Sequence, residues 1–396
     1  MQLILEYLLY LYIFSIPFDS ILLGNMMSIP KTIALLLVIS FAIETILNLK
    51  NTKFKIGEFI YFLILILYII LKVLVSVNFE ISLNRFFVFV QLLLVTFISV
   101  SKMSKNKYIF KNAIFAYLTG TIIIYFISIG KIIFNGYNFA RLNAFGTPGE
   151  EAHYSIILSI AFIILVVLLK EKNKLILKIF LLTNLILGII LSQTRSSWLA
   201  VTFIIILDIL LFNKSKNRFI FIIMIALVIF ALDNFIISNY NFKIVELINK
   251  RTFDALETGG AGRVEIWDTA LPLIKEKPIF GFGFDTFSYV YNYQYIKDVV
   301  LPRGEHRAAH NIYLAIIIEN GIMGFIIFLS GILILLKNNL KIKNAKNSQY
   351  FQIALYTLLA VLIIGFFIDI LYRKYFWFVI SLSLSIVKLK KCNYYK

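Results

Sequence analysis

The stretch YSIILSIAFIILVVLL-KEKNK-LILKIFLLTNLILGIILSQ (residues 154–193) decides the fold class. Two apolar runs of 16 and 19 residues flank a five-residue connection that carries three lysines. A helix that crosses a bilayer needs about 20 mainly apolar residues. The pattern therefore predicts two membrane helices joined by a short basic loop.

The same pattern extends over the whole chain. Of its 396 residues, 60% are hydrophobic and 15% are charged, with a mean hydropathy of +0.88. These values exclude a soluble globular domain, a disordered chain and a coiled coil, since each needs more polar surface. Cys392 is the one cysteine, so no intrachain disulfide can form. We expect an all-α polytopic bundle of about twelve helices, in which the first span is retained. The predicted spans are 1–17, 32–48, 59–77, 83–100, 113–133, 154–169, 175–193, 196–212, 219–238, 312–336, 350–368 and 374–388.

Basic residues alternate between the connections. One set of connections, together with the C-terminal tail, holds 22 Lys and Arg residues, and the short connections of the opposite set hold six. By the positive-inside rule both termini are cytoplasmic and the long connection 239–309 is external. The chain then divides into nine spans over 1–238, this external loop, and three spans with a cytoplasmic tail over 310–396. The net charge of +18 reflects topology and contact with anionic lipids. We expect no nucleic acid partner.

Polar residues that interrupt the apolar pattern gather on the predicted external side. They include His153, His306 and His310, together with Arg141 and Arg195. Arg195 lies in a hairpin of about four residues between two spans, which holds it near the membrane boundary. Its guanidinium group suits the phosphates of a lipid headgroup, which it can bind through two parallel hydrogen bonds. Snorkelling at a helix end is an equally good interpretation of Arg195. The simpler interpretation of Arg263 is an exposed residue at the N-terminus of a helix, and that of His153 and His306 is surface or helix-cap polarity.

The spacing of His306 and His310, and the position of Glu319, each have competing interpretations. His306 and His310 have the i, i+4 spacing of a metal site, but Arg307 follows the first of them where a zinc protease would have Glu. We therefore expect no metal. Glu319 lies about two turns inside a predicted span, where an ionisable group is functional by default, although it could equally be a structural partner for an arginine.

The end of this region resembles a known family. His310-Asn311, nine further residues and then Gly321-Ile-Met-Gly324 resemble the His-Asn/Ser-x9-Gly-x-x-Gly signature of bacterial O-antigen ligases and the related O-antigen polymerases. Arg263 with Trp267, followed by Pro278–Gly283, is similar to the stretch that precedes this histidine in the superfamily. Phe145–Pro148 and the Arg195 hairpin look like its two earlier external motifs. In the ligases a Thr often follows the second Gly, where this chain has Phe325. The resemblance covers about residues 140–325.

The resemblance implies a membrane glycosyltransferase of the GT-C type in the bacterial inner membrane, with its active site on the external face. The donor would be a glycan on undecaprenyl diphosphate. A ligase passes the glycan to lipid A-core, and a polymerase passes it to another lipid-linked repeat. By motif, His310 is the expected catalytic base, and Arg195 and Arg263 are the expected pair that binds the diphosphate. We also expect Arg141, Asn311 and Arg307 to contact the substrate, and no cofactor to take part.

The chemistry can also be argued without the family. Outside the cytoplasmic membrane an enzyme has no nucleotide sugar, so its donor must carry its own activation, as a lipid diphosphate sugar does. The leaving diphosphate needs fixed cations, which arginine supplies. An acceptor hydroxyl must lose a proton, and neutral imidazole is the natural base near pH 7. A single displacement predicts inversion. The sequence has no Asp-x-Asp pair, which favours arginine over a divalent ion.

Two other classes stay open on the sequence. A transporter or flippase for polysaccharide also has about twelve spans, but its polar sites lie near the membrane midplane. A non-catalytic scaffold of an envelope assembly would share the motifs without the activity.

The long external loop has its own predicted structure. We expect helices at about 242–256 and 263–275, with Pro272 kinking or ending the second. Five aromatic side chains of this loop could stack on sugar rings, although anchoring at the membrane interface is the preferred interpretation. They are Trp267, Tyr289, Tyr291, Tyr293 and Tyr295.

Overall fold

A computed structural model of the chain describes most of its length. The described residues are 2–23, 27–47, 60–134, 141–143, 149–169, 174–212, 253, 263–295, 308–342 and 348–391. Several of our predictions fall outside them. These are the span 219–238, the helix at 242–256, the segment Phe145–Pro148, His306 and Arg307, and the cysteine Cys392.

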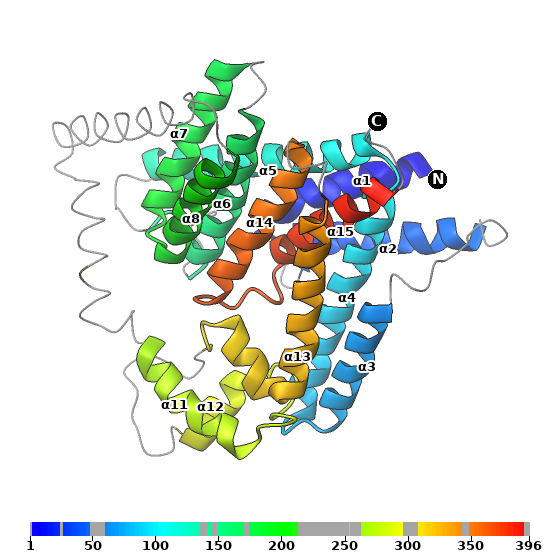
Figure 1. Ribbon diagram of the computed structural model, residues 1–396, viewed down its shortest axis with the longest axis vertical. Helices are drawn as coiled ribbons and strands as arrows, with labels where there is room; N and C mark the ends of the chain where they lie inside the picture. Colours follow the sequence, from blue (N-terminus) through cyan, green and yellow to red (C-terminus); the bar gives the residue numbers. More distant parts are fainter. Residues whose placement is uncertain are drawn as a thin grey trace.

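Helices occupy all eleven predicted spans that fall on described residues (Figure 1). Their bounds are α1 (Gln2–Ser15), α2 (Ile29–Leu47), α3 (Ile60–Leu74), α4 (Phe79–Met103), α5 (Lys107–Phe134), α6 (Glu151–Leu168), α7 (Leu175–Leu191), α8 (Arg195–Phe212), α13 (Ile312–Leu340), α14 (Gln349–Gly365) and α15 (Lys374–Lys391). A 3₁₀ turn, Ile16–Phe18, and two short paired strands, β1 (Leu22–Leu23) and β2 (Met27–Ser28), connect α1 to α2. The all-α class is confirmed.

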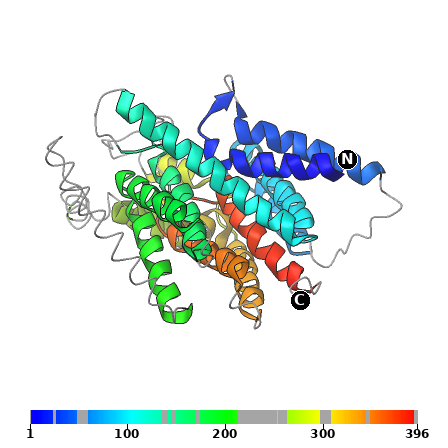
Figure 2. The same cartoon turned by 90° about the horizontal axis from the view of Figure 1, so that it is seen from above.

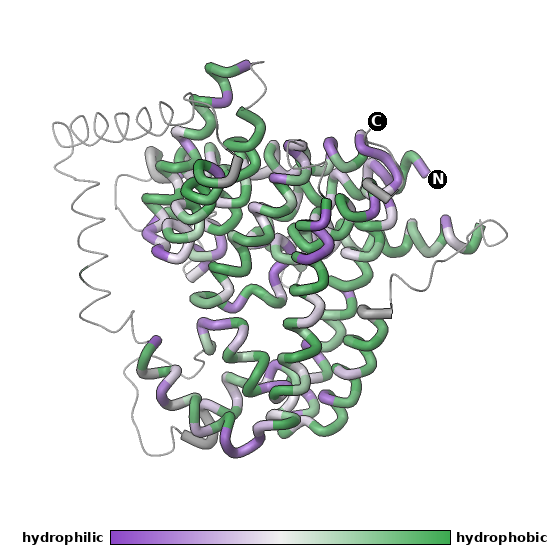
Figure 3. Tube along the Cα trace, in the orientation of Figure 1, coloured by the Kyte–Doolittle hydropathy of each residue, from purple (hydrophilic) through white to green (hydrophobic). Residues whose placement is uncertain are grey.

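Length and composition mark several of these helices as membrane-crossing. Five are long and apolar enough, namely 29–47, 79–103, 107–131, 151–168 and 312–340, and four shorter helices are apolar as well. Apolar residues follow the lengths of the helices, and hydrophilic ones gather mainly near their ends (Figure 3). The protein is therefore a multi-pass membrane protein. The count of twelve spans and their orientation stay predictions.

Close helix contacts depend on small residues, as is usual for helices in membranes. A Cβ atom added to Gly120 of α5 would lie 2.1 Å from the carbonyl oxygen of Phe14 in α1, and α1, α2 and α5 lie side by side (Figure 2). Buried hydroxyl groups, such as those of Thr96 and Ser159, donate to the carbonyl four residues earlier in their own helix. Their polarity is thus satisfied without a partner helix.

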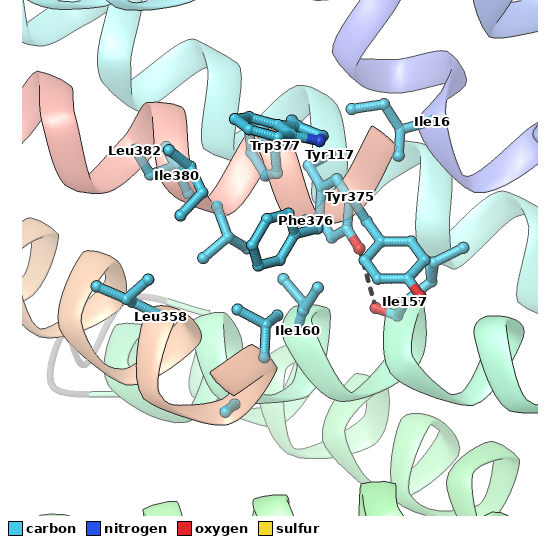
Figure 4. Packing of buried hydrophobic residues seen from close by; sticks show 14 of the residues in the cluster. Ile16, Tyr117, Ile157, Ile160, Leu358, Tyr375, Phe376, Trp377, Ile380 and Leu382 are labelled. Carbon is cyan, nitrogen blue, oxygen red and sulfur yellow. Dashed lines mark hydrogen bonds between the residues drawn. The ribbon is translucent and has the colours of Figure 1, made fainter. Parts of the chain in front are cut away.

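Helix α15 runs through the main core. Its Phe378 ring stacks on Tyr117 of α5 with centroids 4.8 Å apart, and the Tyr117 hydroxyl donates to the carbonyl of Ile157 in α6 (Figure 4). Phe376 and Tyr375 are buried in the same region. The beginning of α15 is therefore held against α5 and α6, which fixes the short connection 366–373 that precedes it.

Helix α13 is broken at Gly321, where φ is 67° and ψ is −176°. The segment 278–283 fills the break with backbone hydrogen bonds. The amide of Phe282 donates to the Ile318 carbonyl at 3.0 Å, and the amide of Ile322 donates to the Pro278 carbonyl at 2.8 Å. Carbonyl and amide groups that the break frees in the apolar bundle are thereby satisfied. The sharp turn between the two halves of α13 is visible in Figure 1.

Two further helices, α11 (Arg263–Glu276) and α12 (Phe287–Tyr295), pack beside the first half of α13 (Figure 1). Helix α11 confirms the expected helix at 263–275, and it continues through Pro272 to Glu276, so the proline does not end it. A separate apolar cluster joins the three elements, with Ile266, Phe287 and Ile318 among its buried members. Helices α11 and α12 therefore pack against α13 next to its break, and the segment between them fills that break.

Glu319 has a structural role in this assembly. Its side chain is 4% exposed and accepts hydrogen bonds from the amides of Asp285 at 3.2 Å and Phe287 at 3.3 Å. It therefore caps the first turn of α12. A structural role is thus supported, but the hydrogen bonds come from backbone amides of α12 and its preceding turn, while Arg85 is near enough to interact with the charge of Glu319.

Replacing Gly281 by alanine should disrupt this region. The new Cβ atom would lie 2.5 Å from the Gly321 nitrogen and from the Ile318 carbonyl oxygen, at a position whose φ is +64°. We expect a loss of about 3 kcal/mol or more in the free energy of unfolding, measured as a lower thermal midpoint of the purified protein in detergent. Gly130→Ala is the matched control, because nothing lies within 4 Å of that Cβ position. Equal midpoints for the two variants would show that the glycine contact is not needed.

Candidate active site

Three arginines from separate segments form the positive part of the site. Arg141 precedes α6, while Arg195 and Arg263 begin α8 and α11. Burial, together with the positive charges of Arg195 and Arg141, lowers the pKa of Arg263. The Arg141 and Arg195 guanidinium groups are therefore near enough to Arg263 for their charges to interact with it. The sequence analysis proposed four substrate-binding arginines. The three that lie within the described residues, Arg141, Arg195 and Arg263, come together in the structure.

Neighbouring groups fix the directions of these arginines. Arg141 donates from Nε to the Ser192 carbonyl at 3.1 Å and lies 3.9 Å from the Glu151 carboxylate. The Arg263 guanidinium lies 5.9 Å from the centroid of the Phe367 ring, within the range of a cation–π contact. Ordered guanidinium groups suit a ligand with several anionic oxygens, such as a diphosphate.

His310 is exposed, and its backbone is tightly held. Its φ of 49° lies in the left-handed region. The indole of Trp267 donates to the carbonyl of Ala309 at 3.0 Å, and the carboxylate of Asp369 accepts a hydrogen bond from the His310 amide. Asn311 follows as the N-cap of α13, where its side-chain oxygen accepts from the amides of residues 313 and 314. Contacts on both sides hold the strained conformation.

Two series of contacts place His310 near the arginines. Arg263 and Trp267 are one turn apart on α11, which puts their Cβ atoms about 5–6 Å apart, and Trp267 binds the residue before His310. Phe367 contacts Arg263, while Asp369, two residues later, binds His310. The motif residues Arg263, Trp267 and His310 therefore belong to one site, with the connection between α14 and α15 as its other wall.

A second histidine adjoins this site. His153, in the first turn of α6, shares a hydrogen bond of 2.8 Å between its Nδ1 atom and the Tyr375 hydroxyl. It is near enough to His310 and Arg373 to interact with their charges. Arg373 in turn makes two hydrogen bonds to Glu150, at 3.1 and 3.2 Å. His153 thus lies in the first turn of a helix, as one of the two simple interpretations had it, but its partly buried ring contacts Tyr375 of α15.

Sequence reasoning missed several residues of this site. We did not propose Asp369, which binds the His310 amide, Phe367, which contacts Arg263, or Glu150 and Tyr375, which bind Arg373 and His153. We counted Arg373 only as a loop charge. A signal existed, because the short connection 366–373 carries Asp369 and Arg373 between two strongly apolar stretches. Other predicted features have structural roles: Tyr291 is 2% exposed and stacks on Phe287, so it neither faces a sugar nor anchors the membrane interface. Within the described ranges no three His, Cys, Asp or Glu side chains form a metal-binding group.

Asp369 makes the protein's stability depend on pH. Burial raises the pKa of its carboxyl from 3.8 to about 6, against the opposing effect of the His310 amide. The folded protein therefore binds this proton more tightly than the unfolded chain, and stability falls as pH rises through about 6. The full difference corresponds to about 3 kcal/mol.

Asp369→Asn removes this titration while keeping a side-chain oxygen for the His310 amide. We expect the variant to be more stable than the wild type by about 3 kcal/mol at pH 7.5 and by about 1 kcal/mol at pH 4.5, from unfolding midpoints measured across that range. Asp268→Asn, at an exposed position of α11, should stay within about 0.5 kcal/mol of the wild type. An Asp369→Asn effect that does not change with pH would contradict the titration.

Comparisons with known proteins agree with this site. A family model described as O-antigen ligase matches residues 179–329, which include Arg195, Arg263 and His310. An uncharacterised protein of Haemophilus influenzae is 26% identical over 161 residues, covering 37% of this chain and 40% of that protein. A ComP-specific O-oligosaccharyltransferase of Acinetobacter baylyi is 28% identical over 214 residues, covering 53% of this chain and 37% of that protein. The aligned regions thus span two-fifths or less of these relatives. The resemblance found in the sequence is confirmed: residues 179–329 are similar to the O-antigen ligase family, and an O-oligosaccharyltransferase is among the relatives of the chain.

Proposed function

We propose that the protein is a membrane glycosyltransferase of the O-antigen ligase type. It transfers a glycan from undecaprenyl diphosphate to a hydroxyl group of an acceptor, for which lipid A-core is the first candidate. The observation that carries the proposal is the proximity of His310 to three clustered arginines from segments far apart in the sequence. The superfamily match over the same residues supports it.

The arginines act on the leaving group. As the bond between the anomeric carbon and the phosphate oxygen breaks, charge develops on the diphosphate. Arg195 and Arg263, with Arg141 beside them, stabilise this charge through guanidinium hydrogen bonds in a half-buried site. The cationic groups are already clustered in the protein, so the reaction proceeds without a divalent ion and the leaving group needs no proton.

His310 acts on the acceptor. Its exposed imidazole takes the proton of the acceptor hydroxyl while the oxygen of that hydroxyl attacks the anomeric carbon on the face opposite the diphosphate. The configuration at that carbon is therefore inverted. A base of this kind contributes about 10²- to 10⁴-fold to the rate. The contacts of Asp369 with the His310 amide and of Trp267 with the Ala309 carbonyl hold the backbone that carries the imidazole.

The charge distribution supports a location for this chemistry. Arg141, Arg195 and Asp369 lie in short connections that are poor in Lys and Arg, and the long connection 239–309 exceeds the length over which loop charges decide orientation, so by the positive-inside rule the site faces away from the cytoplasm. The protein then works in the bacterial inner membrane on glycans that have already crossed it.

The acceptor defines the competing activities. A polymerase of the same superfamily would pass the glycan to a second lipid-linked repeat. The name of the Acinetobacter relative, a ComP-specific O-oligosaccharyltransferase, adds a protein hydroxyl as a third acceptor class. A transporter for lipid-linked glycans would move the donor without breaking it. The polar cluster at the ends of α6, α8 and α14 favours transfer, since transporters place such groups near the midplane.

One assay separates these functions. The purified chain in EDTA receives a polyprenyl diphosphate glycan with lipid A-core, with no added acceptor, or with a serine-rich peptide. We expect a single core-dependent product. Ladders of lipid-linked glycan without core would identify a polymerase, and modified peptide would identify a protein oligosaccharyltransferase. An intact donor under all three conditions would refute glycan transfer.

A further inference from the structure

A narrow cavity lies where three connections meet, and its lining includes His153 and Arg373. Its walls come from the turn after α1, with Asp19 and Ser20, from the start of α6, with Glu150 and His153, and from the start of α15. The cavity has a volume of about 20 Å³. A cavity of this size has room for one water-sized group, such as a single hydroxyl.

The charged groups on its walls are already paired. Glu150 binds Arg373 through two hydrogen bonds. Asp19 binds Lys374 and accepts from the Ser28 hydroxyl at 2.7 Å. Paired charges give the cavity little preference for an anion, and they leave carboxylate lone pairs that can accept from a neutral hydroxyl. The cavity thus differs from the arginine cluster in the ligand that it suits.

One wall group lacks a partner. The hydroxyl oxygen of Ser20 is buried and makes no hydrogen bond to any residue that the structure describes. A buried polar atom without a partner costs about 1–3 kcal/mol, so such an atom beside a cavity indicates a polar occupant.

The cavity and the arginine cluster lie on two sides of the α6 N-terminus. Glu151 is 3.9 Å from Arg141 of the cluster, whereas Glu150 and His153 line the cavity. His153 is close enough to His310 for their charges to interact. Asp369, which binds the His310 amide, precedes the wall residue Arg373 by four residues. His310 therefore lies near a slot for a neutral hydroxyl as well as near the arginine cluster.

We infer that this slot, formed by Ser20, Glu150 and His153, binds one hydroxyl or hydroxymethyl group of the acceptor sugar. The inference rests on the proposed function. A second hydroxyl of the same sugar then stands at His310. When it reacts, its proton passes to the imidazole, its oxygen bonds to the anomeric carbon of the donor, and the electron pair of the broken carbon–oxygen bond leaves with the diphosphate. The slot thereby selects which hydroxyl of the acceptor reacts.

Filling the slot tests this inference. In Ser20→Leu a larger apolar side chain occupies the cavity, and Ser20→Val serves if the leucine variant does not accumulate. The assay uses whichever acceptor supports transfer by the wild-type chain. We expect the KM for the acceptor to rise about 10-fold or more, with the KM for the donor unchanged. The control is Ser330→Leu, whose native hydroxyl donates only within α13, to the carbonyl of Ile327.

Each outcome is decisive. An unchanged acceptor KM in a folded Ser20 variant, with or without a change in thermal midpoint, would mean that the slot holds a structural water only, and the inference would be wrong while the proposed function stands. An equal rise in the KM for donor and acceptor would also overturn it. Lack of transfer by the wild-type chain with every acceptor would instead refute the proposed function.

Discussion

Replacing His310 should lower glycan transfer by about 10²- to 10⁴-fold without lowering the amount of folded protein. The imidazole removes the acceptor proton in the proposed reaction, and a positioned base contributes a factor of this size. His310 is exposed, and its amide and the carbonyl of Ala309 make the hydrogen bonds to Asp369 and Trp267 that hold this segment. Initial rates with saturating donor and acceptor measure the loss.

The choice of substitution matters because the backbone at His310 is left-handed, with a φ of 49°. Alanine adopts this conformation with strain, whereas asparagine is enriched there. His310→Asn should therefore match the wild type in thermal midpoint and still lose transfer. Added imidazole should restore part of the activity of His310→Ala, since it can enter the space that is left. Transfer by His310→Asn at the wild-type rate would remove His310 from the mechanism.

Loss of Arg263 should lower kcat/KM for the donor by about 10²- to 10³-fold, the cost typical of removing one group that stabilises developing negative charge. Arg263→Met keeps the length and apolar stem of the side chain. Arg263→Lys keeps the charge without the planar fork, so it should recover only part of the activity. Lys275→Met, at an exposed position near the end of the same helix, should keep wild-type kinetics.

The same variant should be at least as stable as the wild type. Burial and the charges of Arg195 and Arg141 lower the pKa of Arg263, which means that the empty site carries a repulsive charge cluster. Removing one charge relieves this repulsion, as happens at active sites that trade stability for activity. An unchanged kcat/KM for the donor in Arg263→Met would show that the arginine does not bind the diphosphate.

The helices were predictable because hydropathy reports directly on contact with lipid. The predicted helix ends were less accurate. Helix α4 begins at Phe79, four residues before the predicted span at 83, and α5 begins at Lys107, six residues before the predicted span at 113. In α4, Asn78 caps the first turn, where its side chain accepts from the Ile81 amide. A prediction based on apolar stretches alone does not include the polar residues that continue a helix at the membrane surface.

The break at Gly321 depends on the segment 278–283, which lies about 40 residues earlier in the chain. Its glycines were recognisable as a motif, but the motif does not reveal that the two glycine segments supply hydrogen bonds to each other. The site shows the same division. Arg195, Arg263 and His310 could be proposed because each is polar where its surroundings are apolar. Asp369 and Phe367 could not be proposed, because only the folded structure shows that they contact His310 and Arg263.

The most direct test is a structure of the protein with a bound polyprenyl diphosphate sugar. The proposed mechanism predicts guanidinium nitrogens of Arg195 and Arg263 about 2.7–2.9 Å from diphosphate oxygens, with the His310 imidazole facing the anomeric carbon across the space for one acceptor hydroxyl. A donor bound with its diphosphate away from these arginines, or with His310 separated from the anomeric carbon by more than a sugar unit, would contradict it.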